Sequence, residues 1–274
     1  MFLNSKLNIV NLFTICYLVS SIFYLPFATF SWQLLAFAVF NFFWFGLASS
    51  MYYHRCLTHR SFKLAYPVEI FFLIGGLIGL GGDPIKWAAI HRFHHQKSDH
   101  DDDTHSPKHG FFWSYYGWVL HHDLPLIEEL KHKNSKDLLE KKHLYLAQSI
   151  AAESLPHAIY VGVTALFFGL DMAIIGIILP CILSYHAHWM LIASLCHIPR
   201  FGYRRFNMPD NSRNLPWLSF LSFGESLHNN HHKYPNYVNL KSAPMEFDIS
   251  ASFVSFLEKL GLATQVKRTN YDKK

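Results

Sequence analysis

The sequence predicts an all-α integral membrane protein, with four transmembrane helices in two hairpins and a helical cytoplasmic cap that carries the histidines. Hydrophobic residues make up 51% of the 274 residues and charged residues only 16%, whereas a soluble domain carries about 25% charged residues. Four stretches are apolar over roughly the 20 residues that a crossing helix needs. Lysine and arginine avoid the turns within each hairpin, which argues against a soluble helical protein. We expect a single domain over residues 1–274.

The four predicted spans are joined in pairs by very short turns. Thr29–Phe30 joins the first two, and Asp171 marks the turn between the last two. All 24 lysines and arginines lie outside these turns, and positive charge stays on the cytoplasmic side of a membrane. Both termini and the segments 54–153 and 197–274 are therefore expected in the cytoplasm. The spans are Leu7–Ala28, Ser31–Tyr53, Ser154–Leu170 and Met172–Leu191.

Two further apolar segments are not expected to cross. Pro67–Leu80 contains Glu69 and three glycines, and its length of about 14 residues suits an interfacial or re-entrant segment. If it crossed, the histidines before and after it would face opposite sides of the membrane. Near the C-terminus, apolar residues at helical spacing predict an amphipathic helix that lies on the membrane or caps the cytoplasmic part. These residues are Ile249, Phe253, Phe256, Leu257 and Leu260.

Charge and cysteine usage exclude two other classes of protein. The formal net charge of +5 does not indicate nucleic-acid binding, because the basic residues form no motif and a membrane explains their placement. The four cysteines have no paired spacing, which predicts reduced packing residues rather than disulfides or a zinc site. They are Cys16, Cys56, Cys181 and Cys196.

Ordered clusters among the 19 histidines predict a metal centre. Two clusters share the spacing i, i+3, i+4, which places three imidazoles on one face of a helix. One such face cannot surround an ion, but three faces together can enclose two. Imidazole suits Zn, Cu, Fe and Ni, whereas structural zinc sites are four-coordinate and usually include thiolates. A hydrocarbon substrate favours a redox metal, and we expect two iron ions. The clusters are His54 and His59; His91, His94 and His95; and His228, His231 and His232.

The remaining histidines divide by their place in the chain. His197 follows the fourth span and is a ninth candidate ligand. His186 and His188 lie deeper in that span, where a structural role is favoured over a functional one. Three histidines flank the acidic run Asp99–Asp103 and are candidates to support the ligands from behind: His100, His105 and His109. Four others are expected to be solvated: His121, His122, His132 and His143.

Three long motifs carry a family resemblance. They are HRCLTHRSFK (His54–Lys63), HRFHHQKSDHDDDTHSPKHGFFWSYYGWVL (His91–Leu120) and NSRNLPWLSFLSFGESLHNNHHKYP (Asn211–Pro235). This pattern resembles the membrane fatty acyl desaturases of the delta-9 acyl-CoA type, over most of the chain from the second span to Leu262. The resemblance implies four transmembrane helices beneath a cytoplasmic cap that holds a di-iron centre. The implied ligands are His54, His59, His91, His94, His95, His197, His228, His231 and His232.

The resemblance also implies the reaction and its partners. A desaturase of this type uses O2 and two electrons to introduce a cis double bond into a saturated acyl chain, linked to coenzyme A or to a lipid. Electrons are expected from a separate ferredoxin or cytochrome b5 type protein. One rival is a lipid hydroxylase with the same di-iron centre. Another is a metal carrier without enzymatic activity, which would place its ligands along a path across the bilayer.

One residue departs from the family pattern. The family usually has Asn-Ser-x-x-His before the ligand at position 197, and this chain has Ala193 in place of the asparagine. Alanine can neither ligate iron nor hold a bound water. The resemblance therefore implies that one metal has a more open shell, or that a group elsewhere compensates.

Three residues are candidates for substrate contact. Arg204 and Arg205 lie between ligand groups and could hold a phosphate-bearing head group; the alternative is that they only mark the cytoplasmic face. Phe42 lies 12 residues before His54, roughly 18 Å along a helix, where a ring facing the bundle would end an acyl tunnel. Ala38, one turn earlier, would leave room behind it.

Overall fold

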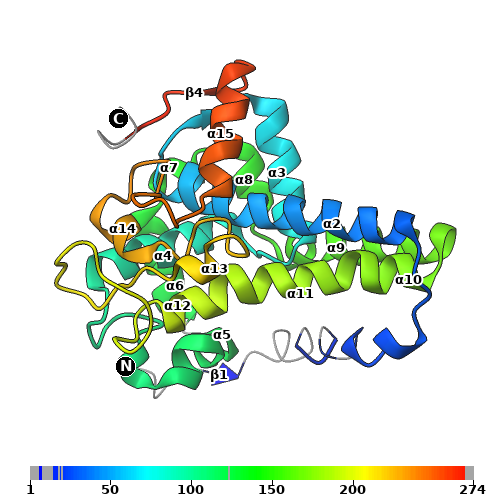
Figure 1. Cartoon of the computed structure of the whole chain (residues 1–274), viewed down its shortest axis with the longest axis horizontal. Helices are drawn as coiled ribbons and strands as arrows, with labels where there is room; N and C mark the ends of the chain where they lie inside the picture. The colour runs from blue at the N-terminus through cyan, green and yellow to red at the C-terminus, as the bar shows by residue number, and fades with distance from the viewer. Residues whose placement is uncertain (1–5, 8–14, 18, 20, 123, 269–274) are drawn as a thin grey trace.

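The computed structural model describes residues 6–7, 15–17, 19, 21–122 and 124–268. Two long helical rods run side by side through it (Figure 1). The first joins α2 (Trp32–Leu47) to the π-helix η3 (Ala48–Thr58) without a break. The second runs from α10 (Leu170–Ala173) to α12 (Leu191–Leu195). Between its ends lie η6 (Ile174–Ile178), α11 (Leu179–Tyr185) and η7 (His186–Met190).

These two rods are the helices long and apolar enough to cross a membrane among the described residues, with 27 and 26 residues. They contain the second and fourth predicted spans, although the first rod continues past Tyr53 to include the first histidine cluster. The third predicted span overlaps α9 (Ile150–Phe168), whose apolar portion Ser154–Phe168 is shorter, but the helix ends before Leu170. Of the first predicted span, residues 8–14, 18 and 20 lie outside the described residues, and its described C-terminal part includes the 3-10 helix η2 (Leu25–Phe27).

The start and end of these helices follow from a few local signals. The Ser31 side chain accepts a hydrogen bond from the Leu34 amide at 3.1 Å and caps α2. Ser149 caps α9 in the same way, through the amide of Ala152. These hydroxyls satisfy amides that a helix start leaves open. Gly169 then reverses the chain between α9 and α10, with a φ of 90° that favours glycine.

A buried amide holds the rods together. Asn41 of α2 donates from Nδ2 to the Gly176 carbonyl of η6 at 2.9 Å. Tyr160 of α9 donates its hydroxyl to Asn41 Oδ1 at 3.3 Å. In an apolar bundle a polar side chain needs such partners, because an unpaired polar group is costly away from water. Asn41 thus fixes how α2, α9 and η6 meet.

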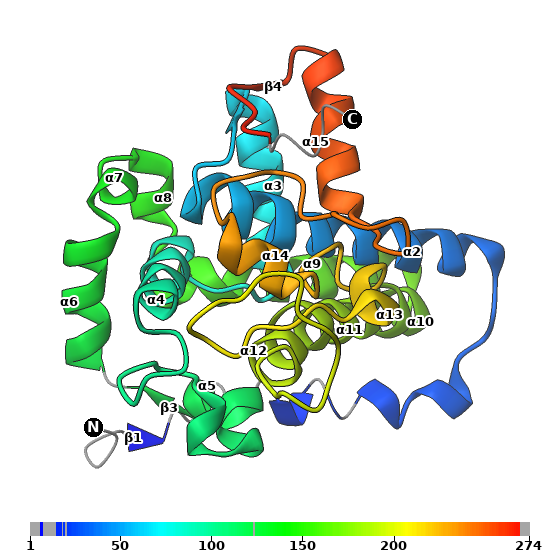
Figure 2. The same cartoon turned by 60° about the vertical axis from the view of Figure 1, so that its left-hand side comes forward.

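Most of the remaining elements gather at one end of the rods (Figure 1). The candidate site lies mainly on α4 (Pro84–Lys97) and α14 (His228–Lys233), which Figures 1 and 2 both place close together. Asp83 caps α4 by accepting from the Ile85 and Lys86 amides, ahead of Pro84. The other helices are η2 (Leu25–Phe27), α3 (Tyr66–Ile78), η4 (Pro107–His109), η5 (Trp113–Gly117), α5 (Trp118–Leu120), α6 (Leu124–Asn134), α7 (Lys136–Leu139), α8 (Lys142–Leu146), α13 (Pro216–Ser219) and α15 (Ile249–Lys259).

Two short antiparallel strand pairs tie distant segments together. β1 (Lys6–Leu7) pairs with β3 (His121–His122), and β2 (Lys63–Leu64) pairs with β4 (Ala263–Thr264). The second pair brings the end of the chain beside the segment that follows the first histidine cluster.

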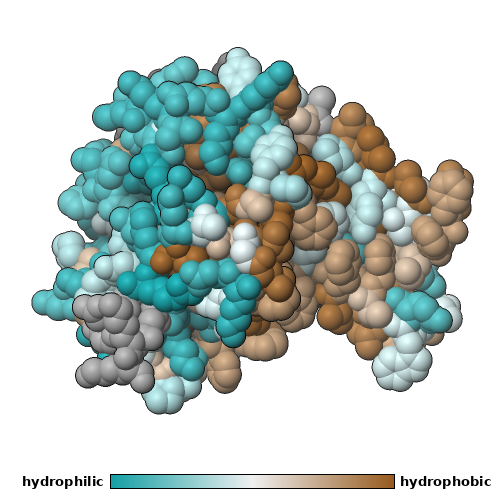
Figure 3. All heavy atoms as spheres, turned by 90° about the horizontal axis from the view of Figure 1, so that it is seen from above, coloured by the Kyte–Doolittle hydropathy of each residue, from teal (hydrophilic) through white to brown (hydrophobic). Residues whose placement is uncertain are grey.

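The surface divides into a polar end and an apolar end (Figure 3). Large apolar side chains are exposed along the rods and α9, away from the histidines. A protein surrounded by water rarely exposes so many large apolar side chains in one region. They include Leu35, Val39, Phe40, Ile159, Val163, Leu166, Phe167, Phe168 and Leu183.

Two predicted segments outside the spans are helical. Pro67–Leu80 corresponds to α3, whose Glu69 is bonded to Lys141 at 2.9 Å and to His143 at 3.1 Å. The prediction that His143 is solvated is wrong, because its ring is largely covered and faces this carboxylate. The predicted amphipathic helix corresponds to α15, which packs Val254 and Leu257 into the core and leaves Phe256 exposed. All four cysteines are free.

Candidate metal centre

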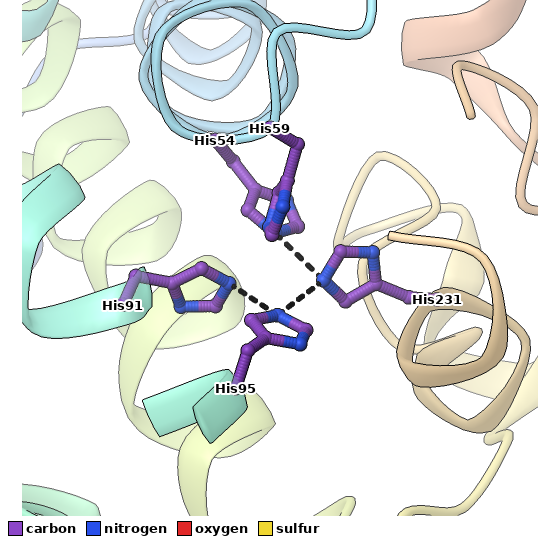
Figure 4. A group of neighbouring side chains, drawn as sticks. All are labelled: His54, His59, His91, His95 and His231. Atoms are coloured by element: carbon purple, nitrogen blue, oxygen red, sulfur yellow. Dashed lines mark hydrogen bonds between the residues drawn. The ribbon is translucent and has the colours of Figure 1, made fainter. Parts of the chain in front are cut away.

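Nine buried or half-buried histidines converge in two groups. In each group the potential ligand atoms lie within 4.8 Å of one another. The groups are His54, His59, His91, His95 and His231, here the five-histidine group, and His94, His197, His228 and His232, the four-histidine group. Figure 4 shows the five rings of the first group pointing toward a common centre from three separate segments.

The π-helix explains how His54 and His59 reach one site. In an α-helix, residues five apart lie about 140° apart around the axis and face different directions. In η3 the His59 amide donates to the His54 carbonyl at 3.1 Å, the i to i+5 bond of a π-helix. The wider turn stacks the two residues, and their Nε2 atoms approach to 3.1 Å. The HxxxxH spacing thus becomes a pair of convergent ligands.

Helices α4 and α14 each contribute to both groups. On α4, His91 and His95 face the five-histidine group, with Nε2 atoms 3.0 Å apart, while His94 faces the other. On α14 the allocation is reversed. His228 and His232 join the four-histidine group, at 3.0 Å, and His231 contacts His95 across the gap at 2.9 Å. The i, i+4 pair of each helix therefore belongs to one group and the i+3 residue to the other.

Carboxylates fix three rings of the four-histidine group. His94 Nδ1 lies 2.9 Å from Asp103, and His232 Nδ1 lies 2.8 Å from Asp210. His197 Nδ1 lies 3.3 Å from Asp99. A carboxylate at Nδ1 holds the proton there, which leaves the Nε2 atom as a bare lone pair.

Two of these lone pairs, on His197 and His232, point at His228 Nε2, and a neutral His228 can donate at most one proton there. The Nε2 atoms of His197 and His228, and of His228 and His232, are each 3.0 Å apart. Bare lone pairs at such distances repel unless a cation lies among them, so this donor set fits a metal ion. Burial and neighbouring histidines hold the pKa of most of these rings well below its usual range, which keeps them in the neutral form that binds metal. The rings so affected are His59, His91, His95, His228, His231 and His232.

Glu225 links the five-histidine group to the protein interior. Its carboxylate contacts His54 Nδ1, accepts from Arg55 at 2.9 Å and accepts from Ser50 at 2.5 Å. Arg55 is itself fully buried and pairs with Asp248 at 2.8 Å. Although burial opposes ionisation, His54 and Arg55 lower the pKa of Glu225 to about 2. The carboxylate is therefore ionised and orients the His54 ring.

The acidic run behind α4 supports the second group. His105 stacks on His94 with ring centroids 4.3 Å apart, and both rings lie close to Asp103. Although burial opposes ionisation, His94 and His105 lower the pKa of Asp103. Because Asp103 already engages His94, this trio holds a ligand ring in place rather than forming a third site. His109 is exposed and contacts the Asp101 carbonyl.

The histidines of the second rod have local partners. The Tyr115 hydroxyl lies 2.7 Å from His186 Nδ1. His188 Nδ1 donates to the Ser184 carbonyl at 2.6 Å, and its buried Nε2 has no partner among the described residues. His157 of α9, which the sequence did not single out, donates from Nδ1 to the Ile78 carbonyl at 2.6 Å. These bonds fit the structural role expected for His186 and account for one nitrogen of His188.

A small cavity lies between the two groups. Residues of both groups line it, and Ala193 and Ile192 of α12 form part of its wall. The other lining residues are Ser49, Ser50, His54, Trp87, His91, His94, His105, His188, Glu225 and His228. The cavity gives a small molecule or one segment of a chain a place beside both groups.

The three candidate substrate residues lie apart from that cavity's lining. Phe42 is half-buried, and its ring packs on Phe43 and Phe223 with centroids 5.9 and 5.4 Å away. Arg204 bonds to the Met208 carbonyl. Arg205 is exposed, and its amide donates to Asn229 of α14 at 2.9 Å.

Sequence reasoning missed Glu225, Arg55 and Asp210. Glu225 stands three residues before His228, but it lies in the turn ahead of α14, so no helical spacing links it to that cluster. Arg55 stands next to a predicted ligand, but a buried arginine looks like any other in a sequence. Asp210 has no local signal.

Comparison with known proteins places these features in context. A family model described as fatty acid desaturase matches residues 30–242. Delta-9 acyl-lipid desaturase 1 of Arabidopsis thaliana is 36% identical, over 96% of this chain and 84% of that protein. Delta-9 acyl-lipid desaturase 2 of the same plant is 37% identical, over 81% and 71%. The sn-1 stearoyl-lipid 9-desaturase of Anabaena variabilis is 33% identical, over 81% and 79%.

Proposed function

The chain belongs to the fatty acid desaturase family and is a fatty acyl desaturase, and from this premise we propose that it introduces a cis double bond at the delta-9 position of a lipid-linked saturated acyl chain. The position and the lipid linkage rest on the names of the relatives above. The observation that carries the proposal is the pair of histidine groups that both contribute to the lining of one cavity.

Two iron ions are the proposed occupants, one in each group. Iron held there would activate O2, which with two electrons and two protons takes up the two hydrogens of adjacent methylenes, so that one double bond and two waters form. The electrons come from a separate donor protein of the ferredoxin or cytochrome b5 type. Nine imidazoles and no thiolate among the grouped residues favour iron over a structural zinc.

The protein's own residues position the ions and the chain. Asp99, Asp103 and Asp210 keep their ligand rings in one tautomer, and Glu225 does the same for His54. Ile192 and Ala193 give the cavity an apolar wall, against which methylenes can lie. The burial of both groups excludes bulk water from the reacting carbons.

The membrane arrangement is part of the proposal. We propose one domain with four transmembrane helices in two hairpins and both termini in the cytoplasm. The two long rods, the exposed apolar surface of α9 and the one-sided distribution of lysine and arginine support it. On this orientation Arg204 and Arg205 lie on the cytoplasmic side, where they would meet a phosphate-bearing head group. Labelling of cysteines introduced at positions 97 and 270 from the same side of the membrane is expected; labelling from opposite sides would contradict the arrangement.

Product analysis tests the reaction. The chain is expressed in a desaturase-deficient host, and fatty acids are profiled with location of the double bond. Cis monounsaturated chains with the bond at carbon 9 are expected in the lipid fraction, and His228→Ala, which removes a proposed ligand, should yield none. A hydroxylated chain would identify the rival hydroxylase, and an unchanged profile with full expression would contradict the proposal.

A further inference from the structure

The cavity beside the histidine groups has an inner end that faces the apolar rods. Ser49 and Ser50 line it from the first rod, and His188 lines it from the second. Gly46 lies about one turn before these serines, on the side toward the apolar end of α2. If an acyl chain bound at the histidines extends further between the two rods, it therefore passes Gly46 and His188.

One aromatic ring fills that route. Phe223, from the loop before α14, is fully buried. Its ring centroid lies 4.9 Å from that of His188, and a Cβ added at Gly46 would come within 2.5 Å of its ring atoms. The ring thus spans from the backbone of the first rod to the second. Phe42, the residue that the sequence suggested as a tunnel end, packs behind it at 5.4 Å.

The backbone at this residue is held in an unusual conformation. Phe223 has a φ of 56°, in the left-handed region that a phenylalanine rarely adopts. Such a conformation persists where surrounding contacts impose it, and these conformations cluster at functional sites. Here the Phe223 carbonyl accepts from Arg55 at 3.2 Å, and Glu225, two residues later, contacts His54. The contacts that orient a metal ligand therefore also hold the ring in the route.

We propose that Phe223 is the specificity-determining residue that ends the acyl site, and that Phe42 is a second stop behind it. This inference rests on the proposed function. The Phe223 ring limits how many carbons can lie beyond the reacting pair, whereas the head group on the cytoplasmic side fixes the bond position counted from the carboxyl end. Trimming Phe42 alone leaves the Phe223 ring in place and does not extend the site.

The test compares single and double variants in competition between saturated chains of graded length. Phe223→Ala is expected to shift the product ratio toward longer chains by roughly tenfold for a two-carbon step, since one methylene misfit in an apolar pocket costs about that much or more. Phe42→Ala alone should leave the ratio unchanged, and Phe42→Ala in the Phe223→Ala background should lengthen the preferred chain further. The double bond should stay at the same carbon throughout.

Three further variants keep the test decisive. Phe223→Leu fills part of the space that alanine leaves and should give a smaller shift in the same direction. Gly46→Ala adds a methyl group against the Phe223 ring, which narrows the route further and should favour shorter chains. Phe72→Leu is the matched control, because Phe72 is a buried ring of the same core that packs on Phe71 and Phe253, and it should not change the ratio. Metal content is measured for each variant.

The outcomes separate this inference from the proposed function. An unchanged length ratio in a Phe223 variant that holds metal overturns the inference, as does lengthening by Phe42→Ala alone. If both Phe223 variants lose metal, Gly46→Ala decides: a shift to shorter chains supports the inference and no shift overturns it. A parent enzyme that holds metal but forms no double bond contradicts the proposed function instead.

Discussion

The two histidine groups are held in place by different means. In the four-histidine group, three of the four rings have a carboxylate at Nδ1. In the five-histidine group, the described residues give a carboxylate at Nδ1 to His54 alone, from Glu225, and the π-helical backbone of η3 aligns His54 with His59. Side-chain contacts thus hold most rings of the four-histidine group. The five-histidine group relies more on helix geometry, and it has one additional ring. We therefore expect the two groups to respond differently to the same kind of mutation.

Removal of one ligand from each group should have the largest effect. His228→Ala leaves three imidazoles in its group, whereas His95→Ala leaves four. Both variants should lose activity by more than about 100-fold, the upper end of what loss of a ligand's supporting partner costs. Iron per chain, measured by mass spectrometry, should fall to about one in His228→Ala and stay near two in His95→Ala. Equal loss of iron in both variants would show that the fifth histidine ring does not help the five-histidine group to retain its ion.

Glu225→Gln should come next, and its effect should reach beyond the metal. The change leaves the buried Arg55 with one carboxylate, Asp248. Breaking a buried ion pair costs about 3–5 kcal/mol, and we expect the lower end because the amide oxygen can still accept a hydrogen bond. The free energy of unfolding of the metal-free protein, from denaturant titration in detergent, measures it. A variant as stable as the parent would mean that Asp248 alone suffices.

Asp103→Asn should weaken metal binding and little else. An amide cannot hold the proton on His94 Nδ1 as a carboxylate does, and loss of such a partner typically costs about 10–100-fold in metal affinity. Competition with a chelator measures the affinity. Asp102→Asn is the matched control, since Asp102 is exposed and pairs with Lys97 at 3.6 Å, away from the histidine rings. Unfolding of Asp103→Asn under conditions where Asp102→Asn is intact would contradict a role confined to the metal.

The smallest effect is expected from replacing Asp137, which pairs with the arginine that joins α4 to η3. Arg92 of α4 donates to the Leu57 and Thr58 carbonyls and pairs with Asp137. Although burial opposes ionisation, Arg92 and Arg60 lower the pKa of Asp137 to about 2. The stabilisation is therefore fully present above the unfolded pKa of about 4 and is lost as the pH falls toward 2.

For a partly exposed ion pair such as Arg92–Asp137, this stabilisation should amount to less than about 1 kcal/mol. Asp137→Asn should lower the stability of the metal-free protein by this amount at pH 7 and by progressively less below pH 4. Unfolding followed at several pH values measures it. A stability difference between the parent and Asp137→Asn that grows as the pH falls would contradict a stabilising role for the ionised Asp137.

The sequence predicted the candidate rings but not how they divide. Spacing alone predicted one helix that carries His91, His94 and His95, as α4 does. It could not predict that His94 joins His197 and His228, because that depends on which helix faces which. Nor could it predict the π-helix, since i to i+5 bonding has no residue signature and an α-helix would have turned His54 and His59 apart. His143 was misassigned because the carboxylate that it meets, Glu69, lies in a distant apolar run.

The crossed allocation of rings on α4 and α14 has a consequence for how the centre fills. Each helix reaches both groups, so an ion in either group restrains both helices at once. The second ion then meets rings whose freedom has already been reduced, and it loses less entropy on binding. Metal uptake should accordingly be positively cooperative, with few chains carrying a single ion at intermediate iron concentrations.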